Sequence, residues 1–214
     1  MVIELFGLPG SGKSFLCDKI QELGYAKNIM KFYKENFIGK VIFHLFLNCF
    51  TINKKLKKLY NDSLKIIGNT ANYKNQINSS IPINLYVKYM VYIFFLENNI
   101  KKNIIIDEGI MHYSMALHAE YDLELEKIEE IIKLYEVKSK QTYCLKCDKD
   151  IILMQIKKRN RKNTSIDFLD ENELNNILEK YSKAQEFLVR KYKINYLNIN
   201  EIISKIEERK NGKI

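Results

Sequence analysis

The chain has 214 residues, of which 46% are apolar and 29% are charged, so it has the composition of a folded globular protein rather than a disordered one. Its formal net charge is +9, but the lysines are spread along the sequence and form no separate basic block. A lysine-rich composition with a site for a polyanionic small molecule therefore explains the charge better than nucleic-acid binding does.

The first half of the chain predicts one strand followed mainly by helices. Residues 2–6 form an apolar run that is typical of a short buried strand, and a glycine-containing loop leads from it into a helix over 13–23. Apolar residues recur at helical spacing through 30–67, which indicates further helices. The polar, asparagine-rich segment 69–80 predicts a loop, and 83–99 predicts a long helix.

The second half of the chain alternates short strands with helices. Strands are predicted at 103–106, 142–147 and 194–199, and helices at 122–139, 149–158, 171–191 and 200–210. This alternation is typical of an α/β fold with a parallel sheet and helices on both faces. No segment has the composition of a linker, so we expect one domain over 1–214.

The strongest motif lies at residues 7–14, Gly-Leu-Pro-Gly-Ser-Gly-Lys-Ser, which fit the phosphate-binding pattern G-x-x-x-x-G-K-S at every fixed position. Glycines let backbone N–H groups turn toward phosphate oxygens, and the following helix points its positive end at them. The Lys13 ammonium is expected to bridge the β- and γ-phosphates, and the Ser14 hydroxyl to ligate Mg²⁺. We therefore predict a nucleoside triphosphate site made of Gly7, Pro9, Gly10, Ser11, Gly12, Lys13 and Ser14.

An acidic pair and an arginine pair extend this prediction. Asp107 and Glu108 follow the apolar run 104–106, so we expect Asp107 to hold Mg²⁺ and Glu108 to face the second substrate. Arg159 and Arg161 are two of only four arginines, and their forked donors suit phosphate oxygens better than an ammonium does. We expect both to close over the triphosphate and to offset the charge that develops during transfer.

Compartment and membrane signals are weak. Val41–Phe50 and Ile83–Leu96 are apolar but too short to cross a bilayer; buried helices explain them best, and contact with a membrane surface stays open. The phosphate-binding motif begins at Gly7, where a signal peptide would lie, so we expect a cytoplasmic protein with reduced thiols. The pair Cys144 and Cys147 is a minor indication of metal or redox chemistry, because no second pair accompanies it.

These motifs, in this order, resemble the P-loop nucleoside and nucleotide kinases, such as thymidylate kinase and adenylate kinase. The resemblance is strongest over 2–20, 103–112 and 142–163. It implies a P-loop kinase-type three-layer fold with a five-stranded parallel sheet, a helical acceptor-binding region at 30–100 and a short basic lid at 157–165. It also implies ATP and Mg²⁺ as cofactors, Arg159 and Arg161 as lid arginines, and an adenine-binding loop that includes Asn198.

The sequence departs from this family in ways that bear on the acceptor. Gln155 stands where such kinases often carry an arginine, and residues 1–158 contain no arginine that could grip an acceptor phosphate. The acceptor is therefore expected to be a small molecule with a free hydroxyl, such as a nucleoside or sugar-like alcohol, with a nucleotide still open. A hydroxyl acceptor benefits from a base; Glu108 is the first candidate and Glu35 the second. His112 is either a substrate contact or plain packing.

Two other functions stay open at this point. One is a kinase or ATPase directed at polynucleotides, which the net charge favours and the scattered lysines disfavour. The other is a regulatory ATP-binding protein with little transfer activity. The sequence is compatible with either a monomer or a homodimer.

Overall fold

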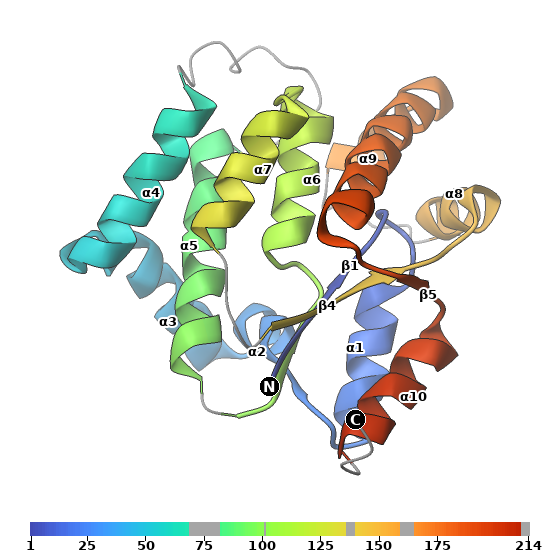
Figure 1. Cartoon of the computed structure of the whole chain (residues 1–214), viewed down its shortest axis with the longest axis horizontal. Coiled ribbons are helices and arrows are strands. Elements are labelled where there is room, and N and C mark those ends of the chain that lie inside the picture. The colour runs from blue at the N-terminus through green and yellow to red at the C-terminus, as the bar shows by residue number, and fades with distance from the viewer. Residues whose placement is uncertain (69–81, 101, 136–139, 159–164, 211–214) are drawn as a thin grey trace.

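The computed structural model describes residues 1–68, 82–100, 102–135, 140–158 and 165–210 (Figure 1). Its strands are β1 (Val2–Phe6), β2 (Lys27–Asn28), β3 (Ile104–Ile106), β4 (Lys140–Leu145) and β5 (Tyr196–Leu197). They form one parallel sheet in the order β2-β3-β1-β4-β5. The predicted five-stranded parallel sheet is thus confirmed.

Helices account for most of the remaining described chain. They are α1 (Lys13–Glu22), α2 (Ile29–Glu35), α3 (Phe37–Cys49), α4 (Lys54–Ile67), α5 (Ile83–Asn99), α6 (Ile110–Tyr121), α7 (Leu125–Leu134), α8 (Lys149–Lys158), α9 (Glu171–Tyr192) and α10 (Ile199–Lys210), with 3-10 turns η1 (Phe50–Ile52) and η3 (Ser165–Phe168). Within the described ranges, none of these helices is both long and apolar enough to cross a membrane.

The sheet separates two apolar cores. Side chains alternate across a strand, so Ile3 and Leu5 of β1 face one core, which α1 and α10 complete, whereas Val2 and Phe6 face the other. Helices α5, α6, α7 and α9 cover that second face (Figure 1). All five residues of β1 are buried, which explains why its sequence reads as a nearly continuous apolar run.

Most predicted elements agree with the structure, and the differences have local causes. The predictions for α5 and α8 match to the residue, whereas β4 begins two residues before the predicted strand. The predicted strand at 194–199 is wrong at both ends, since only Tyr196 and Leu197 pair with β4. Asn198 instead begins the helix α10: its backbone N–H donates to Glu201 (2.7 Å) and its side chain accepts from the Glu201 N–H (3.0 Å).

Strand β2 and helix α6 were not predicted from the sequence. Two other predictions fall partly or wholly outside the described residues. Strand β2 has only two residues, which is too short for any periodic pattern. Helix α6 is almost entirely buried, so it lacks the polar face by which a helix is recognised in a sequence. The predicted helix over 122–139 is confirmed as α7 at Leu125–Leu134, and its last residues, 136–139, lie outside the described residues. The predicted loop 69–80 lies outside the described residues.

The topology brings the two strongest motifs to one edge of the sheet. β1 and β3 are neighbouring parallel strands, with Glu4 paired with Ile106. The phosphate-binding motif follows β1 directly, and Asp107 follows β3 directly. Because parallel strands end at the same edge, the loop and the acidic pair meet there, at the position where open α/β sheets bind ligands.

Candidate active site

The loop that follows β1 has the backbone of a phosphate cradle. Gly10 and Gly12 have φ values of 87° and 91°, a region that strongly favours glycine. A Cβ atom on Gly10 would also lie 3.1 Å from Ile156 and 3.2 Å from Ile152, so a side chain there would press on helix α8. The glycine spacing seen in the sequence therefore has a conformational cause at Gly12 and both a conformational and a packing cause at Gly10.

Lys13 is the first residue of α1, and its side chain folds back over the loop. Its Nζ donates hydrogen bonds to the backbone carbonyls of Gly7 and Leu8, both at 2.9 Å. The residue is only 8% exposed. The predicted phosphate-binding ammonium is thus held at the loop, and the positive end of α1 lies beside it.

Ser14 and Asp107 are 93 residues apart in sequence but in direct contact. The Ser14 hydroxyl donates to Asp107 Oδ2 at 2.6 Å. Asp107 is 5% exposed, and its Oδ1 has no hydrogen-bond partner among the residues that the structure describes. A hydroxyl and a carboxylate with a spare buried oxygen are the hard oxygen donors that Mg²⁺ prefers, so these two residues fit the metal assigned to them.

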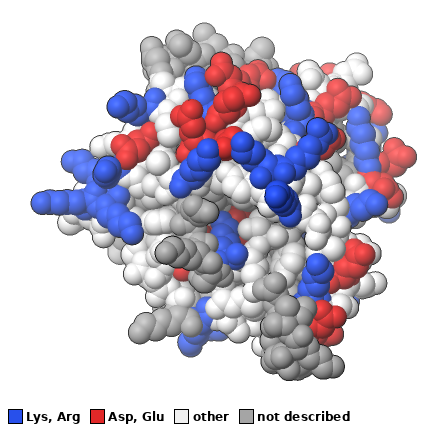
Figure 2. Space-filling view, in the orientation of Figure 1, with Lys and Arg blue, Asp and Glu red and all other residues white. Residues whose placement is uncertain are grey.

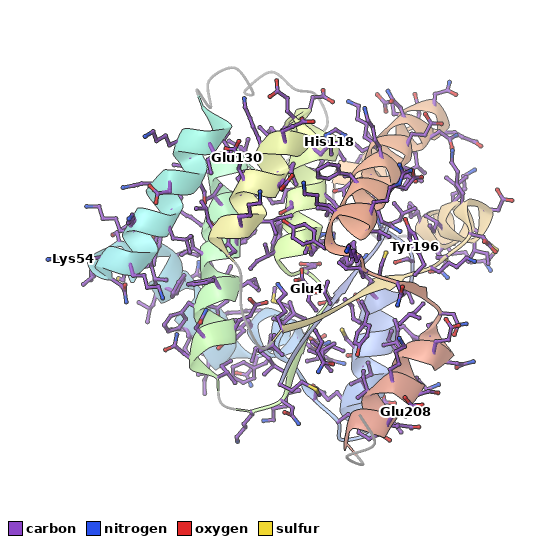
Figure 3. The ribbon with its side chains drawn as sticks, viewed as in Figure 1. Glu4, Lys54, His118, Glu130, Tyr196 and Glu208 are labelled. Carbon is purple, nitrogen blue, oxygen red and sulfur yellow. The ribbon has the colours of Figure 1, made fainter. Side chains whose placement is uncertain are left out.

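Glu4, on β1, supports the turn that carries the acidic pair. Its carboxylate accepts a hydrogen bond from the Met111 backbone N–H at 2.6 Å, and a Cβ atom on Gly109 would collide with it. The glycine after Glu108 is therefore needed to let the carboxylate approach. Figure 3 shows Glu4 near the centre of the molecule, below α6. Sequence reasoning missed this residue, although an acidic side chain inside an apolar strand was a visible signal.

Lys140 and Glu97 complete a buried charge network with Glu4. Lys140 forms ion pairs with Glu4 and with Glu97, the latter at 3.1 Å. Burial raises the pKa of Glu97 to about 7; the Lys140 charge opposes this rise and the Glu4 charge adds to it. Burial opposes ionisation of Lys140, but the two carboxylates still raise its pKa. The network ties β1, β4 and α5 together behind the site.

Glu108 lies two residues before α6, whose first turn carries Tyr113. Burial raises the pKa of Tyr113, and the charge of Glu108 adds to that rise. The Tyr113 ring is 5.7 Å from that of Tyr86 and 5.4 Å from that of Tyr89. The predicted base candidate thus directly precedes a helix whose first-turn tyrosine packs on α5. His112 also contacts Tyr113, with ring centroids 5.6 Å apart.

A pocket of about 620 Å³ opens beside the phosphate loop. It is lined by Gly12, Phe15, Ile151, Gln155 and Asn198, among others. The structure thus brings the predicted adenine-loop residue Asn198 next to the motif. Phe15, which was not predicted from the sequence, is 63% exposed. The only feature of the sequence that could have indicated it is its position immediately after the motif.

The structure describes only part of the predicted lid. Lys157 and Lys158 end α8, and Lys157 pairs with Glu171 at 3.2 Å. Arg159 and Arg161, the two predicted lid arginines, lie outside the described residues. The assignment of these arginines to the triphosphate stays a prediction from sequence.

Comparison with known proteins gives a fold and no family assignment. No family model matches the chain, and neither does any curated protein. The structure of deoxyadenosine kinase from M. mycoides with bound dATP is similar at 16% identity and a TM-score of 0.50, over 99% of this chain and 98% of that chain. Another structure of that enzyme, with the products dCMP and dCDP, gives 16% identity and a TM-score of 0.48, over 99% and 97% of the chains. The chain therefore has the P-loop kinase fold that its sequence predicts.

Proposed function

We propose that this protein is a Mg²⁺-dependent kinase that moves the γ-phosphoryl group of ATP to a hydroxyl group of a nucleoside. The observation that carries the proposal is the contact between Ser14 and Asp107 (2.6 Å) at the mouth of a glycine-rich phosphate loop. The fold, which is similar to that of a deoxyadenosine kinase, supports the same reading.

The loop residues bind and orient the triphosphate in this proposal. Backbone N–H groups of the loop, other than Pro9, which has none, hold the β-phosphate. The Lys13 ammonium donates hydrogen bonds to phosphate oxygens in place of the two carbonyls that it now contacts. Ser14 and Asp107 supply oxygen ligands for Mg²⁺. When bound, the metal ion offsets the negative charge that builds up on the phosphates during transfer.

The pocket beside the loop is suited to the nucleotide base. Phe15 offers an exposed ring for stacking, and Asn198 and Gln155 offer polar groups at the wall. Gln155 lacks the charge of the arginine that the resembling kinases often carry at this position. Arg159 and Arg161 are proposed, from sequence alone, to close over the phosphates.

The acceptor side is proposed to take a nucleoside rather than its phosphate. No arginine precedes Arg159, so a phosphate on the acceptor has no bidentate partner in the first 158 residues. Glu108, half-buried just before α6, is proposed as the base that takes the proton from the acceptor hydroxyl. The tyrosines of α5 and α6 are proposed to line the acceptor side.

Substitution of Glu108 tests this assignment, and Glu35→Gln tests the second candidate for the same role. In Glu108→Gln we expect kcat to fall by about 10²- to 10⁴-fold, the usual contribution of a general base, with KM for ATP little changed. Glu35 is exposed on α2 and should tolerate the same substitution. Equal kcat values for the two variants would remove Glu108 from the base role. A loss of kcat in Glu35→Gln alone would assign that role to Glu35.

A further inference from the structure

Helix α3 exposes an unusually apolar outer face. Phe37 is 80% exposed and Ile52, in the turn that follows, is 82% exposed. Together the exposed large apolar side chains of this segment are Phe37, Ile38, Val41, Ile42, Leu45 and Ile52, which we call the α3 face. Those on the helix are spaced at i, i+1, i+4, i+5 and i+8, so they share one side of it.

Helix α3 is held on the protein by the side opposite the α3 face. The opposite side of α3 is already packed on α5: the Phe43 ring lies 4.9 Å from Tyr92 and the Phe46 ring 5.1 Å from Phe95. Gly39 lies so close to α2 that a Cβ atom would collide with the Phe32 carbonyl. The inner side of α3 therefore fixes the helix on the protein and leaves its outer side as surplus apolar surface.

The segment that carries the α3 face is rich in positive charge, and the nearest acidic residues in the sequence are Glu35 before it and Asp62 after it. The 23 residues from Asn36 to Lys58 contain no Asp or Glu and five lysines. These lysines, all exposed, are Lys40, Lys54, Lys55, Lys57 and Lys58. Figure 3 shows Lys54 projecting outward from the lower end of α4, and Figure 2 shows basic side chains grouped at that edge of the molecule.

Either a second copy of the chain or a membrane could cover such a surface, and the charge of the surface distinguishes between them. A symmetric dimer brings the same patch of both copies together, so lysines would face lysines. A bilayer with anionic lipids satisfies both features, because its acyl region takes the apolar side chains and its headgroups take the lysines. Helix α3 has 13 residues and is about 20 Å long, a length that suits a helix lying in the membrane–water interface.

We propose that the α3 face and its lysines dock this protein on the surface of membranes that contain anionic lipids. Helix α3 lies flat, with the side chains of Phe37, Ile42 and Leu45 among the upper acyl chains. The lysines at the start of α4 contact headgroup phosphates. This docking uses none of the residues assigned to ATP or Mg²⁺, so it stands whether or not the proposed kinase activity does.

Co-sedimentation of the full chain with lipid vesicles tests the proposal. We expect binding to vesicles of phosphatidylcholine mixed with phosphatidylglycerol, and binding at least about tenfold weaker to phosphatidylcholine alone. The triple variant Ile38→Ser/Ile42→Ser/Leu45→Ser should weaken binding by at least about tenfold. The variant Lys54→Gln/Lys55→Gln/Lys57→Gln/Lys58→Gln should lose the preference for anionic vesicles. Leu23→Ser/Phe168→Ser, which removes exposed apolar side chains elsewhere, should bind as the original chain does.

The melting temperature of each variant serves as the control for folding, because all these side chains are exposed and should leave it nearly unchanged. Failure of the original chain to bind anionic vesicles would overturn the proposal, as would unchanged binding by the folded triple variant. Sedimentation velocity without lipid provides a further check. A dimer that the triple variant dissociates would show that a second copy of the chain covers the α3 face instead.

Discussion

At the scale of single residues, the candidate site depends on how Asp107 is held. Its Oδ2 accepts from Ser14, its Oδ1 has no hydrogen-bond partner among the described residues, and both oxygens lie next to the phosphate loop. An almost fully buried carboxylate is costly unless it is compensated. A divalent cation bound by Asp107 and Ser14 would provide that compensation, which is why we assign this pair to Mg²⁺.

Asp107→Asn should raise the Mg²⁺ concentration needed for half-maximal transfer by at least about tenfold, because an amide keeps the shape of the carboxylate but not its charge. A Mg²⁺ titration of ATP-dependent transfer measures this midpoint. The matched control is Asp18→Asn on α1, which removes a carboxylate that pairs with Lys31 at 3.2 Å. If both variants keep the original midpoint, Asp107 does not hold the metal.

At the scale of elements, the phosphate loop is fixed by α8 as well as by its own glycines. Ile152 and Ile156 of α8 fill the space beside Gly10. The residues that follow α8 include the predicted lid arginines. The contact therefore couples the loop to the start of the segment that is expected to close over the phosphates.

Gly10→Ala should destabilise the protein more than Gly24→Ala does. Both glycines have positive φ, 87° and 71°, so both substitutions cost about 1–2 kcal/mol in backbone strain. Only Gly10 also has neighbours within 4 Å, which adds about 1–3 kcal/mol of overpacking. Urea unfolding gives both free energies. Equal losses would mean that α8 does not confine the loop.

The charge network that joins β1, β4 and α5 gives stability a defined pH dependence. Folding raises the pKa of Glu97 from 4.5 to about 7. The protonated group is therefore the one that the fold favours, so its contribution is complete below pH 4.5 and is lost as the pH rises through about 7. Over that range the original chain should lose up to about 3 kcal/mol from this group.

Glu97→Gln tests this linkage, because an amide resembles the protonated acid at every pH. The variant and the original chain should have similar free energies of unfolding near pH 4.5, and the variant should be the more stable one at pH 8. Glu130→Gln, on the exposed side of α7, provides the control and should show no such change with pH. A constant difference between Glu97→Gln and the original chain at all pH values would contradict the account.

At the scale of the whole molecule, the alternating pattern of strands and helices was enough to predict the parallel sheet and its helical layers. The helices α5 and α8 were predicted to the residue, because an apolar pattern and clear ends coincide there. The predicted strand at 194–199 is confirmed only at Tyr196 and Leu197, because the Ile194 N–H still bonds back to α9 and a hydrogen-bonded cap at Asn198 already begins α10. The motif, Asp107 and Asn198 were predicted from sequence; Asp107 accepts a hydrogen bond from Ser14 of the motif, and Asn198 lines a pocket together with Gly12.

Other features depend on contacts that no sequence pattern carries. Glu4 acts on Met111 from 107 residues away, and Lys140 joins two carboxylates that belong to different elements. Phe15 becomes a pocket residue only because α8 and the start of α10 face it. The apolar run that includes Val41 was expected to be a buried helix, yet one side of α3 is exposed.

The most direct test of the central claim is transfer of labelled γ-phosphate from ATP, with Mg²⁺, to a panel of nucleosides, nucleoside monophosphates, sugars and short oligonucleotides. The account predicts label on one or more nucleosides, and at least about 10²-fold less in Lys13→Ala, which removes charge from the phosphate site. Lys19→Ala, farther along α1, should transfer normally. Label on oligonucleotides alone, or on no acceptor while ATP is still bound, would contradict the claim.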